Sequence, residues 1–527
     1  MPDTNPTDRS DTSEGVPGEE TPAELTSQAA DHETEQSVAS VPPSTAPAVT
    51  PSDDDTFGKC EPAAGVLDEV DDVAADGGPD LDDKGRKALA QLMLTCAYVE
   101  HGGLGLYATE VVEEFQMQIG HRQLSTYLPR VRIVDGKTMA TRYENQKITH
   151  EEKEISVFKL WRASPDRRQY YRVVYRYRDP VPAGALNLAT GWAVKPRQGV
   201  WSRMHDHILK IICRGDARLA TWLLDYIADI FQNPDRKRST CVVLVGPPGT
   251  GKSKLLEWIR WLVARAGLKL DRSSQLIGRF NAHLEGKLVI AVEETAFTGG
   301  RIEAAVLKDL ISSPTLTVEE KFGGIRECEN KARIFVCTND RHAVAVEPGD
   351  RRYLVLEVSP ERARDHQYFR ALDDEMASGG DAAMLYDLLN RKITSNLDDP
   401  PQTDSLARQK LFSLGHIEQA LLKVITTGVL CTRDGVLVIT LPTGDETTRV
   451  DRALFDKALE DSAGAPKPTA QRLAAARRMF GIRDVRPTAE DGSRRRQYAI
   501  RSAEQMLENL ARSLNTPPAA ISDALGS

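Results

Sequence analysis

The sequence predicts an α/β protein whose central domain is built around a parallel β-sheet. Between residues 236 and 360, apolar runs of strand length alternate with segments of helical periodicity, and a glycine-rich loop separates the first strand from the first helix. This alternation is typical of parallel sheets, whose ligands bind beyond the carboxyl ends of the strands. We expect strands at 241–245, 288–292, 333–337 and 353–358, and helices at 252–266 and 303–312.

The glycine-rich loop has the residues of a phosphate-binding P-loop. It follows an apolar strand and precedes a helix with one apolar face, which is the context that such a loop requires. Glycines let consecutive N–H groups face an anion, and the helix N-terminus adds partial positive charge. We therefore expect ATP here, with Lys252 reaching its β- and γ-phosphates and the Ser253 hydroxyl binding Mg²⁺. The predicted ATP-binding residues are Gly246, Pro247, Pro248, Gly249, Thr250, Gly251, Lys252 and Ser253.

Two later strands end in polar residues suited to nucleotide chemistry. The strand 288–292 runs into Glu293 and Glu294, and the strand 333–337 is followed by Thr338 and Asn339. Phosphoryl transfer depends on positioning and charge, so we assign Glu293 to the Mg²⁺ shell and Glu294 to the attacking water. The Asn339 amide is placed to sense the γ-phosphate and to help orient that water.

An arginine pair directly precedes the strand 353–358. In a ring of subunits, Arg351 or Arg352 can reach the nucleotide of a neighbour and neutralise charge in the transition state. Such an arginine finger is typically worth on the order of 10³–10⁵ in rate. A surface salt bridge is the alternative interpretation.

A hairpin is predicted between the second and third strands. Two short β-prone runs flank a Gly-Gly dipeptide at 323–324, which is a hairpin signal. Lys321, Phe322 and Arg326 lie near its tip. Basic and aromatic side chains together are suited to gripping the backbone of single-stranded DNA without reading its bases.

Charge is distributed unevenly along the chain. Residues 1–83 contain 22 acidic and two basic residues, a net of −20, whereas the whole chain carries −9. The remainder therefore carries +11, the difference between these values. The composition of the first segment predicts a disordered tail, because it offers little apolar surface to bury. An inert tail is favoured over one that mimics nucleic acid, and the basic remainder is compatible with nucleic-acid binding.

The chain has the composition expected of a reduced intracellular protein. Seven cysteines are scattered without a CxxC pair or zinc-ligand spacing. The N-terminus is polar and acidic, unlike a signal peptide. No apolar run approaches the ~20 residues of a membrane helix, so we expect no membrane partner.

Five regions are expected. The N-terminal region contains a helix at 87–98 and strands near 155–158, 170–175 and 192–194. The C-terminal region has a helix, a second helix and a basic hairpin with arginines at 494–496, an order that resembles a winged helix; a small packing domain is the alternative. The regions are a disordered acidic tail (1–83), a mixed α+β N-terminal region (84–202), a helical lead-in (203–235), the ATPase core with a helical extension (236–427) and a winged-helix-like domain (428–527).

Aromatic and basic residues interleave in one part of the N-terminal region. Trp161, Arg167, Arg168, Tyr170 and Tyr171 could together stack bases and contact phosphates. A half-buried strand with a solvated face is the favoured interpretation.

The motifs taken in order resemble superfamily 3 helicases. They are GPPGTGKS, a strand ending in EE, LKDLISSPTLTVEEKFGG, a strand ending in TN, and DRRYLVLEV. The nearest likeness is to the helicase portion of phage, prophage and plasmid primase–helicase proteins, over roughly residues 90–415. The resemblance implies an AAA+-like core, a homo-oligomeric ring (usually a hexamer), Mg²⁺-ATP hydrolysis and movement along single-stranded DNA.

The resemblance also assigns roles by position. It makes Lys321 the DNA-gripping lysine, Asn339 the sensor, and Arg351 or preferably Arg352 the finger. Residues 84–200 are too short for the primase–polymerase domain that often precedes such a helicase, so priming would come from a separate primase or polymerase. The location implied is the cytoplasm of a bacterial or phage-infected cell.

The leading hypothesis is an ATP-dependent helicase that acts on single-stranded and forked DNA during replication of a mobile element. The alternative is an AAA+-like DNA-remodelling or loading module that binds DNA without unwinding it. A third hypothesis is a non-enzymatic regulator that uses ATP only to assemble a ring, and the Glu293–Glu294 pair argues against it.

Overall fold

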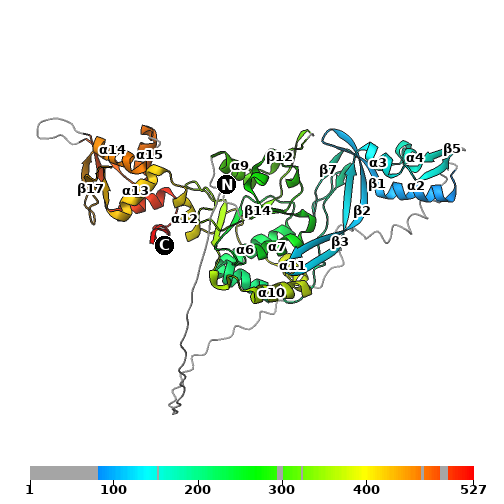
Figure 1. Cartoon of the computed structure of the whole chain (residues 1–527), viewed down its shortest axis with the longest axis horizontal. Coiled ribbons are helices and arrows are strands. Elements are labelled where there is room, and N and C mark those ends of the chain that lie inside the picture. Colours follow the sequence, from blue (N-terminus) through cyan, green and yellow to red (C-terminus); the bar gives the residue numbers. More distant parts are fainter. Residues whose placement is uncertain are drawn as a thin grey trace, which may run out of the picture. The chain divides into compact units, whose positions relative to one another are not determined.

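A five-stranded parallel sheet forms the centre of the described chain (Figure 1). Its order is β10-β11-β14-β9-β15, so the strand that leads into the glycine-rich loop lies between two neighbours. The inner strands are buried apolar runs, as expected for a sheet covered on both faces. The strands are β9 (Cys241–Val245), β10 (Gly267–Leu270), β11 (Val289–Glu293), β14 (Arg333–Thr338) and β15 (Tyr353–Glu357).

This computed structural model describes residues 81–150, 153–293, 301–321, 324–464, 468–486 and 496–526. Nearly all of the predicted acidic tail lies outside these ranges, as do Glu294, Phe322 and residues 494–495. The described residues belong to one compact unit, Phe57–Ser527.

Alternate residues of the sheet point into two separate cores. Val242 and Leu244 of β9 pack on one face, in a core shared with helices on that side. Cys241 and Val243 pack on the other face. The first core includes α6 (Ala217–Gln232), α7 (Lys252–Leu262), α10 (His366–Glu375) and α11 (Asp381–Asn390); the second includes α8 (Ser273–Ile277), α9 (Arg301–Ser312) and the start of α12 (Asp404–Phe412). The predicted α/β class is confirmed, and the edge strand β10 and helix α8 are additions to the prediction.

A buried ionic cluster fixes α6 to the amino ends of the sheet strands. The carboxylate of Asp229, which is fully buried in α6, pairs with Arg333 at 2.8 Å and with Arg238 at 2.7 Å. Burial alone would disfavour the charged carboxylate, but the hydrogen bonds from Arg238 and Arg333 outweigh it and hold the pKa of Asp229 below its ordinary value. Because the cluster joins β14 to α6, it fixes the sheet against the helical layer.

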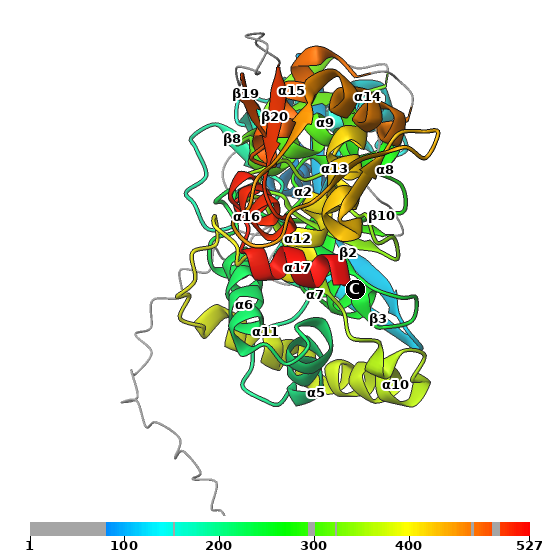
Figure 2. The same cartoon turned by 90° about the vertical axis from the view of Figure 1, so that its left-hand side faces the viewer.

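Helices α6, α10 and α11, together with a shorter helix that precedes α6, gather on one side of the core (Figure 2). This shorter helix is an α-helix that continues as a π-helix, within the region that the sequence predicted as a helical lead-in. The short helices of the central region are α5 (Ser202–Asp206), the π-helices η1 (His207–Ile212) and η5 (Met376–Gly380), and the 3-10 helices η2 (Ala264–Ala266), η3 (Ala282–Leu284) and η4 (Pro360–Arg362).

The N-terminal region is more strand-rich and more extended than predicted. Its main sheet has the order β3-β2-β1-β6, and most of it is one long hairpin, β2–β3. The predicted strand at 155–158 is wrong in its second half, which begins a helix capped by Ser156, and 192–194 is not a strand. The elements are α2 (Asp83–Thr95), β1 (Cys96–His101), β2 (Leu104–Ile119), β3 (Arg122–Val134), α3 (Gly136–Arg142), β4 (Lys147–His150), β5 (Lys153–Ser156), α4 (Val157–Ala163), β6 (Gln169–Tyr170), β7 (Arg172–Val174) and β8 (Ala185–Asn187).

The aromatic and basic residues of this region do not form one exposed surface. Trp161 is fully buried and packs against Tyr107 and Phe158, and Arg168 pairs with Glu110. Tyr171 alone among the three predicted aromatics is largely exposed. The favoured interpretation, a structural role for most of these side chains, agrees with this packing.

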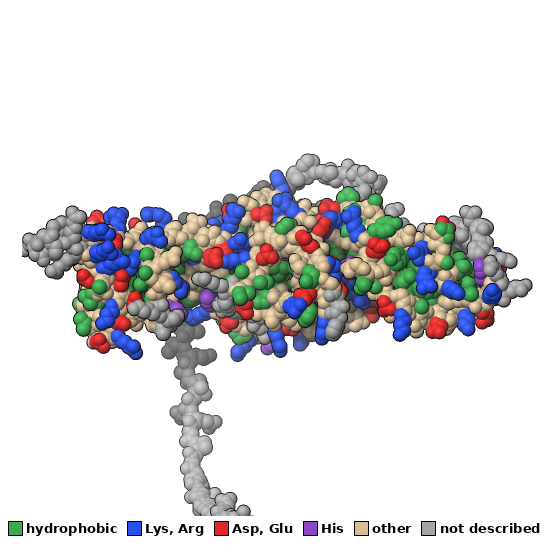
Figure 3. Space-filling model, turned by 90° about the horizontal axis from the view of Figure 1, so that it is seen from above, with side chains coloured by type: hydrophobic (Ala, Val, Ile, Leu, Met, Phe, Trp, Pro, Cys, Tyr) green, Lys and Arg blue, Asp and Glu red, His purple; other side chains and the backbone are tan. Residues whose placement is uncertain are grey.

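The C-terminal region has a separate core and a three-stranded sheet of order β18-β20-β19. The predicted helix, the second helix and the two hairpin strands are present as α14, α15, β19 and β20. Lys and Arg side chains gather over α14 and α15 (Figure 3), where Arg472 and Arg478 are exposed. The elements are α13 (His416–Thr427), β16 (Val429–Cys431), β17 (Leu437–Thr440), β18 (Thr448–Asp451), α14 (Arg452–Ala463), α15 (Ala470–Met479), β19 (Arg483–Val485), β20 (Gln497–Ile500), α16 (Ala503–Ser513) and α17 (Pro518–Gly526).

Candidate nucleotide-binding site

The glycine-rich loop turns between the carboxyl end of β9 and the start of α7. Gly249 and Gly251 have φ angles of 77° and 87°, which other L-residues rarely adopt. A Cβ on Gly251 would also lie 2.5 Å from a ring carbon of Phe369 and 2.6 Å from one of His207. The loop therefore needs glycine at position 251 for its backbone conformation and for close packing.

The Lys252 side chain points back into the loop. Its Nζ donates hydrogen bonds to the carbonyl oxygens of Gly246 (2.6 Å) and Pro247 (2.7 Å) and to Oδ1 of Asn339 (2.9 Å). The residue is only 7% exposed, and burial lowers its pKa. Among the residues that the structure describes, no carboxylate pairs with this ammonium, so its charge is available for an anion.

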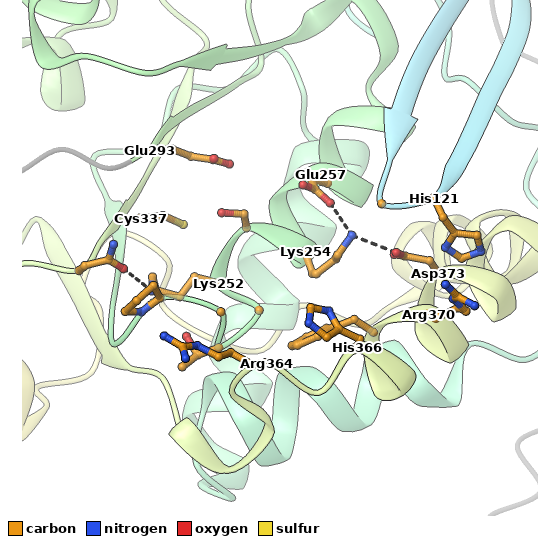
Figure 4. Close-up of a pocket in the computed structure, with 18 of the residues that line it drawn as sticks. His121, Lys252, Lys254, Glu257, Glu293, Cys337, Arg364, His366, Arg370 and Asp373 are labelled. Atoms are coloured by element: carbon orange, nitrogen blue, oxygen red, sulfur yellow. Dashed lines mark hydrogen bonds and ion pairs between the residues drawn. The ribbon is translucent and has the colours of Figure 1, made fainter. Parts of the chain in front are cut away.

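A pocket of about 500 Å³ lies over the loop (Figure 4). The predicted residues Ser253, Glu293 and Asn339 meet there, at the carboxyl ends of the parallel strands. The pocket is lined by Gly120, His121, Pro248, Gly249, Thr250, Gly251, Lys252, Ser253, Lys254, Glu257, Glu293, Cys337, Thr338, Asn339, Arg364, His366, Phe369, Arg370 and Asp373.

The oxygen donors of the pocket suit a magnesium ion that arrives with a nucleotide. Mg²⁺ prefers one or two protein oxygens plus phosphates and water, and Ser253 and Glu293 supply a hydroxyl and a carboxylate. Glu293 forms an ion pair with Lys269 at 2.9 Å, which orients the carboxylate. Within the described ranges, no group of three His, Cys, Asp or Glu residues could hold a metal ion by itself.

His207 packs against the glycine-rich loop and hydrogen-bonds to it, a role that we did not predict from the sequence. Its Nε2–H donates to the carbonyl of Gly251 (3.1 Å), and its Nδ1 accepts from the Tyr368 hydroxyl (3.1 Å). This pattern fits a neutral imidazole, and burial lowers the pKa of His207 to about 4. No local pattern marks this residue, because its partners lie 44 and 161 positions away.

A second unpredicted network lies beside α7. Lys254 Nζ contacts Glu257 at 3.0 Å and Asp373 of α10 at 2.9 Å, and the Trp258 indole N–H donates to Asp373 at 3.2 Å. Burial raises the pKa of Glu257 despite its ion pair with Lys254. The network joins α7 to α10 at the end of the pocket that is farther from Lys252 (Figure 4).

Arg364 reaches the pocket from the segment between β15 and α10. Its backbone N–H donates to the carbonyl of Gly249 at 2.9 Å, and its φ of 62° is unusual for a non-glycine residue. Strained residues of this kind gather at binding and catalytic sites. No sequence motif marks Arg364, and we did not predict it as a site residue.

The two predicted finger arginines lie near the amino ends of the sheet strands, whereas this pocket lies at their carboxyl ends. They precede β15, whose first residue pairs with Cys241 at the amino end of β9. Arg352 donates to Ser312 Oγ at 2.7 Å and pairs with Asp350 at 3.2 Å, whereas Arg351 is exposed. Neither can reach the pocket of its own chain, and Arg351 has the freer side chain.

The predicted hairpin is present as β12 (Thr315–Glu319) and β13 (Ile325–Glu329). Lys321 is exposed beyond the end of β12. Arg326 pairs with Glu285 and, at 2.8 Å, with Glu320, so its side chain fixes the turn end of the hairpin to the segment that holds Glu285. Arg326 is therefore engaged in ion pairs, whereas Lys321 is exposed, although the sequence grouped the two residues.

Comparisons with known proteins give similarity to a phage protein. Residues 244–352 match a family of unknown function, DUF5906. A DNA primase-polymerase of Nitratiruptor phage NrS-1 is 25% identical over 145 residues, which are 27% of this chain and 20% of that protein. The chain thus matches about a fifth of the length of this curated relative.

Solved structures of the C-terminal region of NrS-1 share the fold. One apo structure has a TM-score of 0.52 at 15% identity, and an A-form apo structure has 0.51 at 16% identity. Each likeness covers 71% of this chain and 94% of the other. No helix in the described part of the chain is both long and apolar enough to cross a membrane.

Proposed function

We propose that this protein is an ATP-dependent DNA helicase of the superfamily 3 type, with an AAA+-like core, that acts in replication of a phage, prophage or plasmid. The observation that carries the proposal is the buried Lys252 ammonium, which faces a pocket with Ser253, Glu293 and Asn339 and has no carboxylate partner among the described residues. Similarity to a phage DNA primase-polymerase supports a role in replication-associated DNA processing.

Each residue has a distinct role in the proposed reaction. The P-loop amides and Lys252 hold the β- and γ-phosphates of ATP, and Ser253 and Glu293 hold the Mg²⁺ that neutralises phosphate charge. Asn339 already contacts Lys252 Nζ, so one amide can report on both the lysine and the γ-phosphate. Glu294, which follows β11 and lies outside the described residues, would polarise the attacking water.

Hydrolysis would occur between subunits of a ring, which we propose to be a hexamer. Arg351 and Arg352 lie across the sheet from their own pocket, a position that suits donation to the pocket of a neighbour. Because Arg352 is held by Ser312 and Asp350, the exposed Arg351 is the better candidate for the finger. This reverses the preference drawn from the sequence.

DNA would be moved by the β12–β13 hairpins, with Lys321 gripping the backbone of one strand. Arg326 would transmit force from the core to that hairpin through its ion pair with Glu285. Single-stranded and forked DNA are the proposed substrates, and a separate primase or polymerase would supply primers.

The test compares the protein with Lys252→Ala in two assays. We expect DNA-stimulated ATP turnover and displacement of a forked duplex, and loss of both in the variant. Turnover that requires Lys252 without strand displacement would instead support an AAA+-like remodelling or loading module. Turnover that survives Lys252→Ala would refute the assignment of the pocket.

The choice of finger is tested by Arg351→Ala and Arg352→Ala. Loss of turnover with retained ATP binding is expected for Arg351→Ala. Mixing it with Lys252→Ala subunits should restore part of the turnover, because some interfaces then combine an intact P-loop with an intact arginine. No restoration would contradict a finger that acts between subunits.

A further inference from the structure

The tip of the long N-terminal hairpin β2–β3 lies in the wall of the nucleotide pocket. The two strands are joined by a two-residue turn, Gly120–His121, and both residues line the pocket with the P-loop. Figure 4 shows His121 at the side of the pocket away from Lys252, next to Asp373 and Arg370. A segment far from the P-loop in sequence thus completes the site.

The hairpin is packed firmly along the P-loop helix. Ile119 and Leu128 are buried in the same core as α7. Phe115 stacks on Trp261 of α7, with ring centroids 5.8 Å apart and planes at 17°. Arg265, just beyond α7, lies over the same Phe115 ring, with its guanidinium carbon 5.7 Å from the ring centroid. The tip is therefore held in position by the helix that starts at Lys252.

The tip is also anchored to α10 by charge. Asp374 accepts from His121 Nε2 at 2.8 Å and from Arg122 at 2.6 Å. The hydrogen bond from Arg122 lowers the pKa of Asp374, so the carboxylate stays ionised over a wide pH range. Gly120, with φ of 54°, approaches so closely that a Cβ there would lie 2.2 Å from Asp373 Oδ2.

We propose that the Gly120–His121 tip forms the wall against the nucleoside half of the bound nucleotide, and that His121 is a positioning residue for its base or ribose. The inference rests on the proposed ATP binding at the P-loop. Lys252 and Asn339 mark the phosphate end of the pocket. The opposite end presents the His121 imidazole and the Arg370 guanidinium, with the His366 imidazole between them and Lys252, and these are planar groups suited to packing on a base.

A consequence is coupling between nucleotide binding and the N-terminal region. If the docked tip contacts the nucleotide, whatever displaces the hairpin weakens nucleotide binding, and bound nucleotide stabilises the docked hairpin by the same factor. The route runs from the tip through Asp373 to Lys254, which follows the P-loop serine.

The test uses two probes that share phosphates but differ in the nucleoside: ATP and inorganic tripolyphosphate, each with Mg²⁺. The variants are His121→Ala, which removes the pocket side chain, and Asp374→Ala, which releases the anchor from outside the pocket. Tyr127→Ala on the same hairpin is the matched control, because Tyr127 is 70% exposed and does not line the pocket. Affinities are measured by titration calorimetry on the full chain.

We expect His121→Ala and Asp374→Ala each to weaken ATP binding by about tenfold, the loss of one or two hydrogen bonds or contacts. Tripolyphosphate binding should stay within about twofold in both variants, and Tyr127→Ala should bind both probes as the parent does. Equal losses for the two probes, or unchanged ATP affinity in both variants, would overturn the proposal. Lys252→Ala should lose both probes. If it retains them, the P-loop assignment fails, whereas parent-like ATP affinity in both hairpin variants, with both probes lost in Lys252→Ala, overturns only the hairpin inference.

Discussion

Acid should weaken the P-loop support through His207. The imidazole is fully buried under the loop, and burial lowers its pKa to about 4 from 6.5. The unfolded chain therefore binds one more proton than the folded chain between these two values. Stability from neutral His207 is fully present above pH 6.5 and is lost as pH falls toward 4.

The size of this effect follows from the two pKa values. Between pH 7.5 and pH 4.5, the linkage relation gives a loss of about 2.5 kcal/mol in the free energy of unfolding from His207 alone. Other groups also titrate in this range, so the quantity to measure is the difference between the parent and variants that do not titrate at position 207.

Urea denaturation followed by tryptophan fluorescence suits this measurement, because Trp258 and Trp261 lie in the P-loop helix. His207→Gln retains an amide that can donate to the Gly251 carbonyl, and His207→Ala removes all contacts. Both should lose about 2.5 kcal/mol less than the parent on moving from pH 7.5 to 4.5, while only His207→Ala should be clearly less stable at pH 7.5. An identical pH dependence in the parent and both variants would refute the reasoning.

Three further outcomes are expected. Glu294→Gln should bind ATP as the parent does and lose steady-state turnover, whereas full turnover in a phosphate-release assay would exclude Glu294 as the residue that polarises water. Lys321→Ala should weaken single-stranded DNA binding and reduce the slope of log affinity against log salt by about one contact per subunit, and an unchanged slope would count against a phosphate contact. Asp229→Asn should destabilise the core by about 3–5 kcal/mol in denaturation, because it leaves Arg333 buried without its charged partner; a loss below about 1 kcal/mol would show that the cluster is not a buried ion pair in solution.

Local patterns in the sequence were enough to locate the sheet and the loop. The strands β9, β11, β14 and β15 are continuous apolar runs, because both of their faces are covered. The edge strand β10 was missed, since it is only four residues long and half-exposed. The glycine-rich loop could be located because its glycines, lysine and serine are adjacent in the chain and follow a strand directly.

The long hairpin could have been found by its alternation. Phe115, Met117 and Ile119 occupy every second position before the Gly-His turn, which is the period of a strand with one packed face. From the sequence we expected only mixed α+β structure in this segment. Its docking on α7 could not have been predicted from that period, which indicates that a face is buried but not what covers it.

The remainder of the candidate site was decided by tertiary structure alone. His121 meets Asp374 across 253 positions, and Lys254 meets Asp373 across 119. A sequence motif records residue types that the local backbone brings together, whereas these contacts depend on how separate elements pack. The sequence by itself determined the α/β class and the position of the glycine-rich loop. The walls of the pocket around that loop, from His207 to the hairpin tip, came from the packing of helices and a hairpin that no local pattern connects to it.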